Sequence, residues 1–121
     1  MNNYEKLVVF QKSHKLVLKI YQVVNNFPNS EKYRLTDQMI RAAYSIPSNI
    51  VEGNSKNSTK DYLNFLYIAR GSLHELRYFI LLSKDLGYIN YKLFNELTKC
   101  CDNIAKLLNG LINSLKEKQS A

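Results

Sequence analysis

The polar residues of this sequence do not combine into a catalytic pattern. His74 and Glu75 begin the zinc-protease motif, but Tyr78 stands where its second histidine is required. A di-iron bundle requires glutamates three residues before histidines, and neither His14 nor His74 follows a glutamate at that spacing. The four glycines are scattered and form no loop that would cradle a phosphate. We therefore expect no enzymatic activity, no metal, no cofactor and no small-molecule substrate.

The two cysteines, Cys100 and Cys101, are adjacent in a segment with helical periodicity. A helix points neighbouring side chains about 100° apart, which disfavours a disulfide between them. We expect Cys100 on the apolar stripe as a core residue, and both thiols reduced. The first 15 residues carry scattered charges and no cleavage site, so they do not resemble a signal peptide. No apolar run approaches the roughly 18 residues of a membrane span. These features predict a cytoplasmic protein.

Basic residues give the chain a net charge of +7. Lys12, Lys15 and Lys19 share one helical face, and this basic stripe has two interpretations. It is either a solvated surface or a contact for an anionic partner such as RNA, DNA or the ribosome. If the chain forms an oligomeric ring, the basic stripe is repeated on every subunit, and the weak phosphate contacts of the individual stripes can sum to a useful affinity. The candidate nucleic-acid-binding residues are Lys12, Lys15, Lys19, Arg70 and Arg77.

A second polar group lies within a helix that also contains a proline. Arg41, Ser45, Asn49 and Glu52 are spaced four, four and three residues apart, so they line one face. Pro47 removes a helical hydrogen bond at a cost of about 3 kcal/mol. The polar face permits three interpretations: solvation, a structural network at a helix or subunit contact, or a recognition surface.

We favour the structural network, and a feature of the next helix suggests its partner. Gly71 costs about 1 kcal/mol relative to alanine but allows another backbone to approach closely. Glu75 shares the Gly71 face, so a close helix approach there would bring Glu75 towards Arg41 or Asn49. The expected structural network comprises Arg41, Ser45, Asn49, Glu52 and Glu75.

Four helices must position these residues within one domain, residues 1–121. Apolar periodicity and helix-stop signals predict the four helices at about residues 5–26, 36–53, 58–86 and 90–117. Thr36, Ser58 and Asn90 are the expected N-caps, and Gly53 and Gly87 are the expected stops. Short loops between four helices favour an antiparallel up-and-down bundle. The fold class is therefore all-α.

The apolar stripes predict which helix faces form the core. The first helix offers Phe10, Val17, Tyr21 and Val24; the second Leu35, Met39, Ala42, Ala43, Ile46 and Ile50. The third offers Tyr62, Phe65, Leu66, Ala69, Leu73, Leu76 and Ile80; the fourth Leu93, Leu97, Cys100, Ile104, Leu107, Leu111 and Leu115. The two middle helices carry additional apolar residues outside these stripes, which predicts a second burial surface and self-association. The interface candidates are Ile40, Tyr44, Val51, Leu63, Tyr67 and Tyr78.

Residues 27–53 and 62–76 resemble the family of 23S rRNA intervening-sequence proteins. The first segment supplies Phe27-Pro28, Glu31, Tyr33, Leu35, Thr36, Gln38, Arg41, Ala42, Ser45, Ile46, Asn49, Ile50, Glu52 and Gly53. The second supplies Phe65, Leu66, Ile68, Ala69, Gly71, Ser72, Glu75 and Leu76, followed by Leu86, Gly87 and Tyr88. Arg34 departs from the pattern, where the family often has glycine. The distantly similar accessory protein of diversity-generating retroelements is a basic pentamer that works with a reverse transcriptase and nucleic acid.

The resemblance implies an antiparallel four-helix bundle assembled as a homopentameric ring. Together with the basic stripe, it favours a non-catalytic, homo-oligomeric adaptor that associates with RNA or ribosomes. The alternative is a structural or protein-interaction scaffold with no nucleic-acid role, such as a partner of a reverse transcriptase. The position of the lysines on the folded chain discriminates between these two functions.

Overall fold

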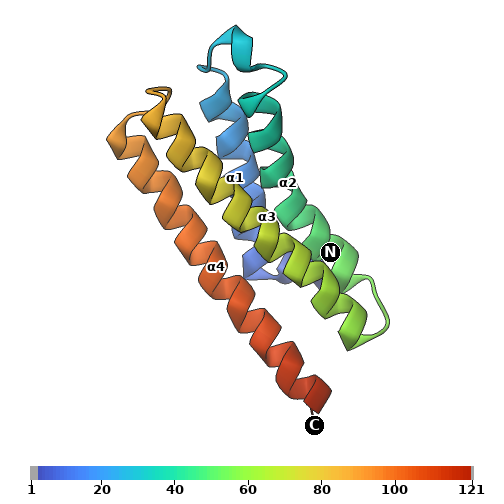
Figure 1. Cartoon of the computed structure of the whole chain (residues 1–121). Helices are drawn as coiled ribbons and strands as arrows, with labels where there is room; N and C mark the ends of the chain where they lie inside the picture. The colour runs from blue at the N-terminus through green and yellow to red at the C-terminus, as the bar shows by residue number, and fades with distance from the viewer. Residues whose placement is uncertain (1–2, 121) are drawn as a thin grey trace.

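The computed structural model describes residues 3–120, and the regular elements in that range are all helical. Four α-helices pack antiparallel as a bundle: α1 Val8–Val24, α2 Leu35–Asn54, α3 Thr59–Asp85 and α4 Tyr91–Ser120 (Figure 1). Two short 3-10 helices, η1 Asn3–Lys6 and η2 Asn29–Glu31, flank α1. The expected all-α, antiparallel four-helix architecture is therefore confirmed. Across residues 3–120, none of the helices is apolar over a length that would cross a membrane.

The helices are arranged so that α2 and α3 form the most extensive contact and α1 and α4 a smaller one. The end of α1, η2, the start of α2 and the α3–α4 turn meet at one end of the bundle (Figure 1). The α2–α3 loop lies at the opposite end, where the C-terminal part of α4 extends outwards. The turn residues at the first end are thus close in space although they are distant in sequence.

The core is built from one apolar stripe of each helix. All six residues expected on the α2 stripe are buried, as are Leu66, Ala69, Leu73, Leu76 and Ile80 of α3. The α1 face is rotated from the expected one: Val17 and Val24 are buried, but Phe10 is half-buried and Tyr21 is exposed. The buried residues of α1 are Val9, Ser13, Leu16, Val17, Ile20, Val23 and Val24.

Other expectations about the core are wrong on α3 and α4. Leu63, expected at an oligomer interface, belongs to the core of the single chain and is 4% exposed. Cys101, rather than Cys100, is fully buried in α4, together with Leu97, Ile104, Leu108 and Ile112. Burial raises the pKa of the Cys101 thiol to about 12, and both cysteines are free. Leu107 and Leu111 flank this stripe and are half-buried.

Helix ends follow the sequence signals at most positions. The Ser58 hydroxyl accepts a 3.1 Å hydrogen bond from the Asp61 backbone, and Asn90 accepts one of 2.8 Å from Leu93, so both act as caps. Gly87 has φ of +81° and follows α3, as expected for a helix stop. Thr36 was expected as an N-cap, but it lies inside α2, which begins at Leu35 and has no side-chain cap.

Gly53 does not stop α2; it lies inside the helix and allows α3 to approach. A Cβ at Gly53 would lie 2.9 Å from the Phe65 Cβ, 2.9 Å from Tyr62 Cδ1 and 3.2 Å from the Tyr62 carbonyl oxygen. The close approach expected at Gly71 does not occur within the chain, because a Cβ there would have nothing within 4 Å. The glycine required by packing is therefore Gly53, and Gly71 lies on an open surface.

Candidate nucleic-acid interface

A groove between α1 and α4 is lined by the three lysines singled out in the sequence. Lys12, Lys15 and Lys19 follow the three- and four-residue spacing of one α1 flank. The groove has a volume of about 210 Å³, and its lining residues are Lys12, Lys15, Leu16, Lys19, Cys100, Asn103 and Ile104. Leu16 and Ile104 are core residues, so the three lysines lie at the border of the core. Their aliphatic stems can cover this apolar edge while the ammonium groups reach solvent.

The charges of these lysines are only partly compensated within the chain. Lys19 Nζ lies 3.3 Å from Glu96 Oε2, in a pair that is half exposed at both side chains. Such surface pairs contribute little to stability and are weakened by salt. Lys12 and Lys15 form no ion pair with any residue in the described range 3–120. The groove therefore keeps excess positive charge.

The outer face of α4 adds a basic row that the sequence reading missed. Lys92, Lys99 and Lys106 are spaced seven residues apart, so they share one helix face over about 21 Å. All three are exposed, and Lys99 and Lys106 lie four and three residues from Asn103, which lines the groove. The seven-residue spacing was a detectable signal, but only the fold shows that α4 lies beside α1. We call the six lysines of the two helices the lysine surface.

The two arginine candidates lie in a different seam, between α3 and α4. Arg70 Nη1 donates a 3.1 Å hydrogen bond to Asn109 Oδ1, and its guanidinium lies 5.1 Å from the centre of the Tyr67 ring. Arg77 pairs with Asp102, while its Nε is buried and has no partner among residues 3–120. The arginines are thus engaged in helix contacts, whereas most of the lysine surface is free.

The expected structural network is not a single network within one chain. Ser45 and Ser72 hydroxyls lie 2.8 Å apart across the α2–α3 contact. Asn49 Nδ2 donates to the Ser45 carbonyl at 2.7 Å and to the Ser45 hydroxyl at 3.0 Å. This three-residue cluster is half-buried and joins α2 to α3.

The charged members of the polar stripe lie outside that cluster. Arg41 binds both oxygens of Asp37, at 3.2 and 3.1 Å, and this hydrogen bond raises the pKa of Arg41. Glu52 pairs with Lys56 at 3.4 Å. Glu75 is exposed and has no hydrogen-bond or ion-pair partner in residues 3–120. The structure therefore brings Glu75 to neither Arg41 nor Asn49 of its own chain.

The interface candidates differ in exposure. Tyr44 is 43% and Tyr78 58% exposed, whereas Ile40 and Val51 are half-buried. Tyr67 is half-buried in the α3–α4 seam, and the centre of its ring lies 5.1 Å from the Arg70 guanidinium and 5.8 Å from Lys116 Nζ. Helix α3 also exposes Ile68 and Leu81, which are not among the interface candidates, although Leu81 is one of the apolar residues outside the predicted core stripe. An apolar surface on α3 is therefore present and uncovered in the single chain.

Metal-ligating side chains do not gather in the described range. Over residues 3–120, no group of three or more histidine, cysteine, aspartate or glutamate side chains is arranged to hold a metal ion. The groove chemistry is instead that of ammonium groups beside an apolar edge. Such groups bind phosphates through charge, with little geometric selectivity.

Comparison with known proteins agrees with the fold. A family model described as 23S rRNA-intervening sequence protein matches residues 5–110. A crystal structure of a protein with unknown function from the S23 ribosomal protein family, from Bacteroides thetaiotaomicron, is 28% identical, with a TM-score of 0.81. The similarity covers 88% of this chain and 96% of that one. No curated protein matches the sequence. Neither description names a catalytic activity.

Proposed function

The chain belongs to the 23S rRNA-intervening sequence protein family, and from this premise we propose that it is a cytoplasmic, non-catalytic, homo-oligomeric adaptor that binds RNA. The observation that carries this proposal is the lysine surface on α1 and α4. Six lysines border one groove or the helix face beside it, and among residues 3–120 the only acidic ion-pair partner of the six is Glu96, which pairs with Lys19. The function of the adaptor is to hold structured RNA, such as ribosomal RNA, through its phosphates.

The lysine surface supports RNA more than a sequence-specific DNA site. Its side chains are flexible cations on two helices, without a recognition helix or base-reading motif. Binding of this kind depends on the shape and charge of the nucleic acid. Oligomerisation multiplies the surface, so that each weak contact adds to the next.

Self-association is the second part of the proposal. Exposed apolar side chains are present on α2 (Tyr44) and α3 (Ile68, Tyr78 and Leu81), whereas the lysine surface belongs to α1 and α4. Gly71 lies on the same α3 surface with open space above it, where a second helix can approach closely. A ring of identical subunits, five as the family resemblance implies, would cover this face and leave the lysines free.

The experiment compares two triple variants with a matched control. Lys12, Lys15 and Lys19 are replaced by glutamine in one variant, and Lys92, Lys99 and Lys106 in another. The control replaces Lys56, Lys60 and Lys118, which lie outside the surface, and changes the net charge equally. Affinity for a structured RNA is measured by fluorescence anisotropy between 50 and 200 mM salt. The affinity of the wild type should fall steeply as the salt concentration rises. Each surface variant should bind more weakly, and the slope of log affinity against log salt concentration should become less negative by about two to three.

Two outcomes would reject this function. No RNA retention by the wild type at 50 mM salt would favour the scaffold function, which the exposed α3 face supports. An equal loss in the control variant would show that net charge, and not the lysine surface, determines binding.

A further inference from the structure

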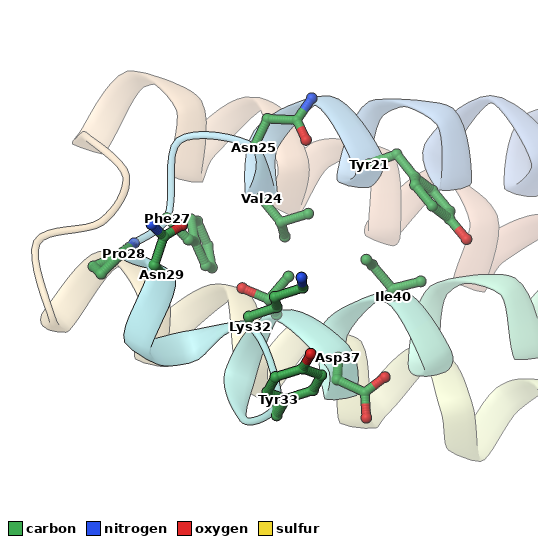
Figure 2. A pocket seen from close by; sticks show the side chains of 11 residues that line it. Tyr21, Val24, Asn25, Phe27, Pro28, Asn29, Lys32, Tyr33, Asp37 and Ile40 are labelled. Atoms are coloured by element: carbon green, nitrogen blue, oxygen red, sulfur yellow. The ribbon is translucent and has the colours of Figure 1, made fainter.

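A second cavity lies at the other side of α1, away from the lysine groove. It has a volume of about 460 Å³, within the range of small-ligand sites, and is formed by the end of α1, η2 and the start of α2. Figure 2 shows Tyr21 and Val24 directed into this space from α1, with Lys32 and Ile40 facing them from the other side. The proposed phosphate contacts of the lysine surface do not use this cavity.

The cavity combines an apolar floor with aromatic rims. Val24 and Phe27 are core residues, 6% and 7% exposed, and they close the bottom. Tyr21 and Tyr33 stand at the rim, 47% and 84% exposed. Neither tyrosine ring stacks on another aromatic ring within residues 3–120. Exposed tyrosines beside an apolar floor are the side chains on which unpaired bases stack.

The polar groups of the cavity favour an anionic ligand with hydrogen-bonding edges. Lys32 Nζ lies 5.4 Å from the centre of the Tyr33 ring, so a cation and a stacking surface are adjacent. Asp37 is the acidic residue of the lining, and Arg41 binds both of its oxygens. Asn25 and Asn29 are exposed at the rim, and their side-chain amides form no hydrogen bond with residues 3–120. A flat aromatic base joined to a phosphate matches this combination.

We propose that this cavity takes one unpaired nucleotide of the bound RNA, with its base against Tyr21 or Tyr33 and its phosphate near Lys32. This inference rests on the proposed RNA-binding function and specifies its substrate as RNA with a bulged or looped nucleotide. Lys15 and Tyr21 flank the exposed outer face of α1 from opposite sides. A strand crossing that face can therefore reach both the lysine surface and the cavity.

The test uses three probes: a fully paired RNA hairpin, the same hairpin with one bulged 2-aminopurine nucleotide, and free AMP. Affinity is measured by anisotropy, and base stacking by quenching of 2-aminopurine fluorescence. The wild type should bind the bulged hairpin about 5- to 100-fold more tightly than the paired one. Tyr33→Ala and Tyr21→Ala should remove this preference and the quenching, whereas Tyr33→Phe should retain them. Affinity for the paired hairpin should not change.

Tyr91→Ala is the matched control, because Tyr91 is 67% exposed and lies outside the cavity. Circular dichroism verifies that each variant keeps its helices. Equal affinity of the wild type for both hairpins, persistence of the preference in both alanine variants, or its loss in Tyr91→Ala would overturn the inference. Binding of AMP as tightly as the bulged hairpin would assign the cavity to free nucleotides instead. Failure of the underlying function is distinguishable, because the paired hairpin would then not bind either.

Discussion

The Tyr88 hydroxyl donates a 2.7 Å hydrogen bond to Glu31 Oε2, joining the turn before α4 to the turn before α2. The two residues are 57 positions apart, and both belong to the motif by which the sequence resembles its family. The Tyr88 ring also packs on Phe27, with centroids 5.2 Å apart. One end of the bundle is thus held together by residues that the sequence reading treated only as motif elements.

This hydrogen bond predicts a pH dependence of stability. The bond to Glu31, together with burial, raises the pKa of Tyr88 above its usual 10.0. The folded chain therefore holds the phenolic proton more tightly than the unfolded chain. The stabilisation is complete below pH 10 and is lost as the pH rises through the folded-state pKa. Tyr88→Phe should be less stable at pH 7, and the difference from the wild type should shrink above pH 10. Urea unfolding followed by circular dichroism tests this, and parallel pH profiles would contradict it.

Gly53 and Gly71, two of the glycines that lie inside helices, should respond oppositely to substitution by alanine. At Gly53 the new methyl group would meet Phe65 and the Tyr62 backbone, so Gly53→Ala should lower the unfolding free energy by about 1–3 kcal/mol. At Gly71 the space is open, and better helix propensity should stabilise the single chain by about 0.5–1 kcal/mol. Thermal and urea unfolding measure both. If Gly71→Ala instead disrupts assembly, a second copy approaches the helix there.

The polar motif predicts a contrast between Asn49 and Glu75. Asn49→Ala removes the bonds to Ser45 and should cost about 0.5–1.5 kcal/mol. Glu75→Ala removes an exposed side chain that has no partner in residues 3–120, so the subunit stability should change by less than about 0.5 kcal/mol. The measurement is the unfolding free energy at low protein concentration. A large Glu75 effect confined to high concentration would place this carboxylate at a subunit contact.

Assembly is predicted from the exposed aromatic residues. Mass photometry or sedimentation at micromolar concentration should give about five times the chain mass of 14.1 kDa. Tyr44→Glu and Tyr78→Glu place a charge on exposed apolar surface and should shift the protein towards smaller species. Lys12→Glu, on the lysine surface, serves as the control and should leave the mass unchanged. A monomeric wild type would reject both the interface and the ring.

The fold was predictable because periodicity and helix-stop signals agree along most of the chain. The α2 stripe was predicted correctly, since its small and apolar residues recur every three or four positions with polar residues between them. On α4, Leu97 and Ile104 are buried as expected, but the stripe was wrong by one position at Cys100, Leu107 and Leu111. Each of these residues is followed by another apolar residue, in the pairs Cys100 and Cys101, Leu107 and Leu108, and Leu111 and Ile112. Each pair offers two faces of nearly equal hydrophobicity, and only packing against α1 and α3 selects one.

The candidate site was predictable only within single helices. Lys12, Lys15 and Lys19 share a face by spacing alone, so their grouping needed no fold. The second basic row became relevant only when α4 was placed beside α1. The cavity next to η2 likewise depends on the fold, because its rim residues Tyr21 and Tyr33 lie on either side of the turn between α1 and α2. The sequence gives no local signal that Tyr21 and Tyr33 face one space.

The buried thiol of Cys101 has a consequence for watching this protein unfold. Cys101 is fully buried and has a pKa of about 12, while its neighbour Cys100 is half-buried at the groove. A thiol reagent can attack Cys101 only after the core has opened, because the thiolate is the nucleophile and burial disfavours it. In a Cys100→Ser background, the labelling rate at Cys101 therefore counts opening events of the core. Cys101 is thus a built-in reporter of how often the core opens, and no label has to be introduced elsewhere in the chain.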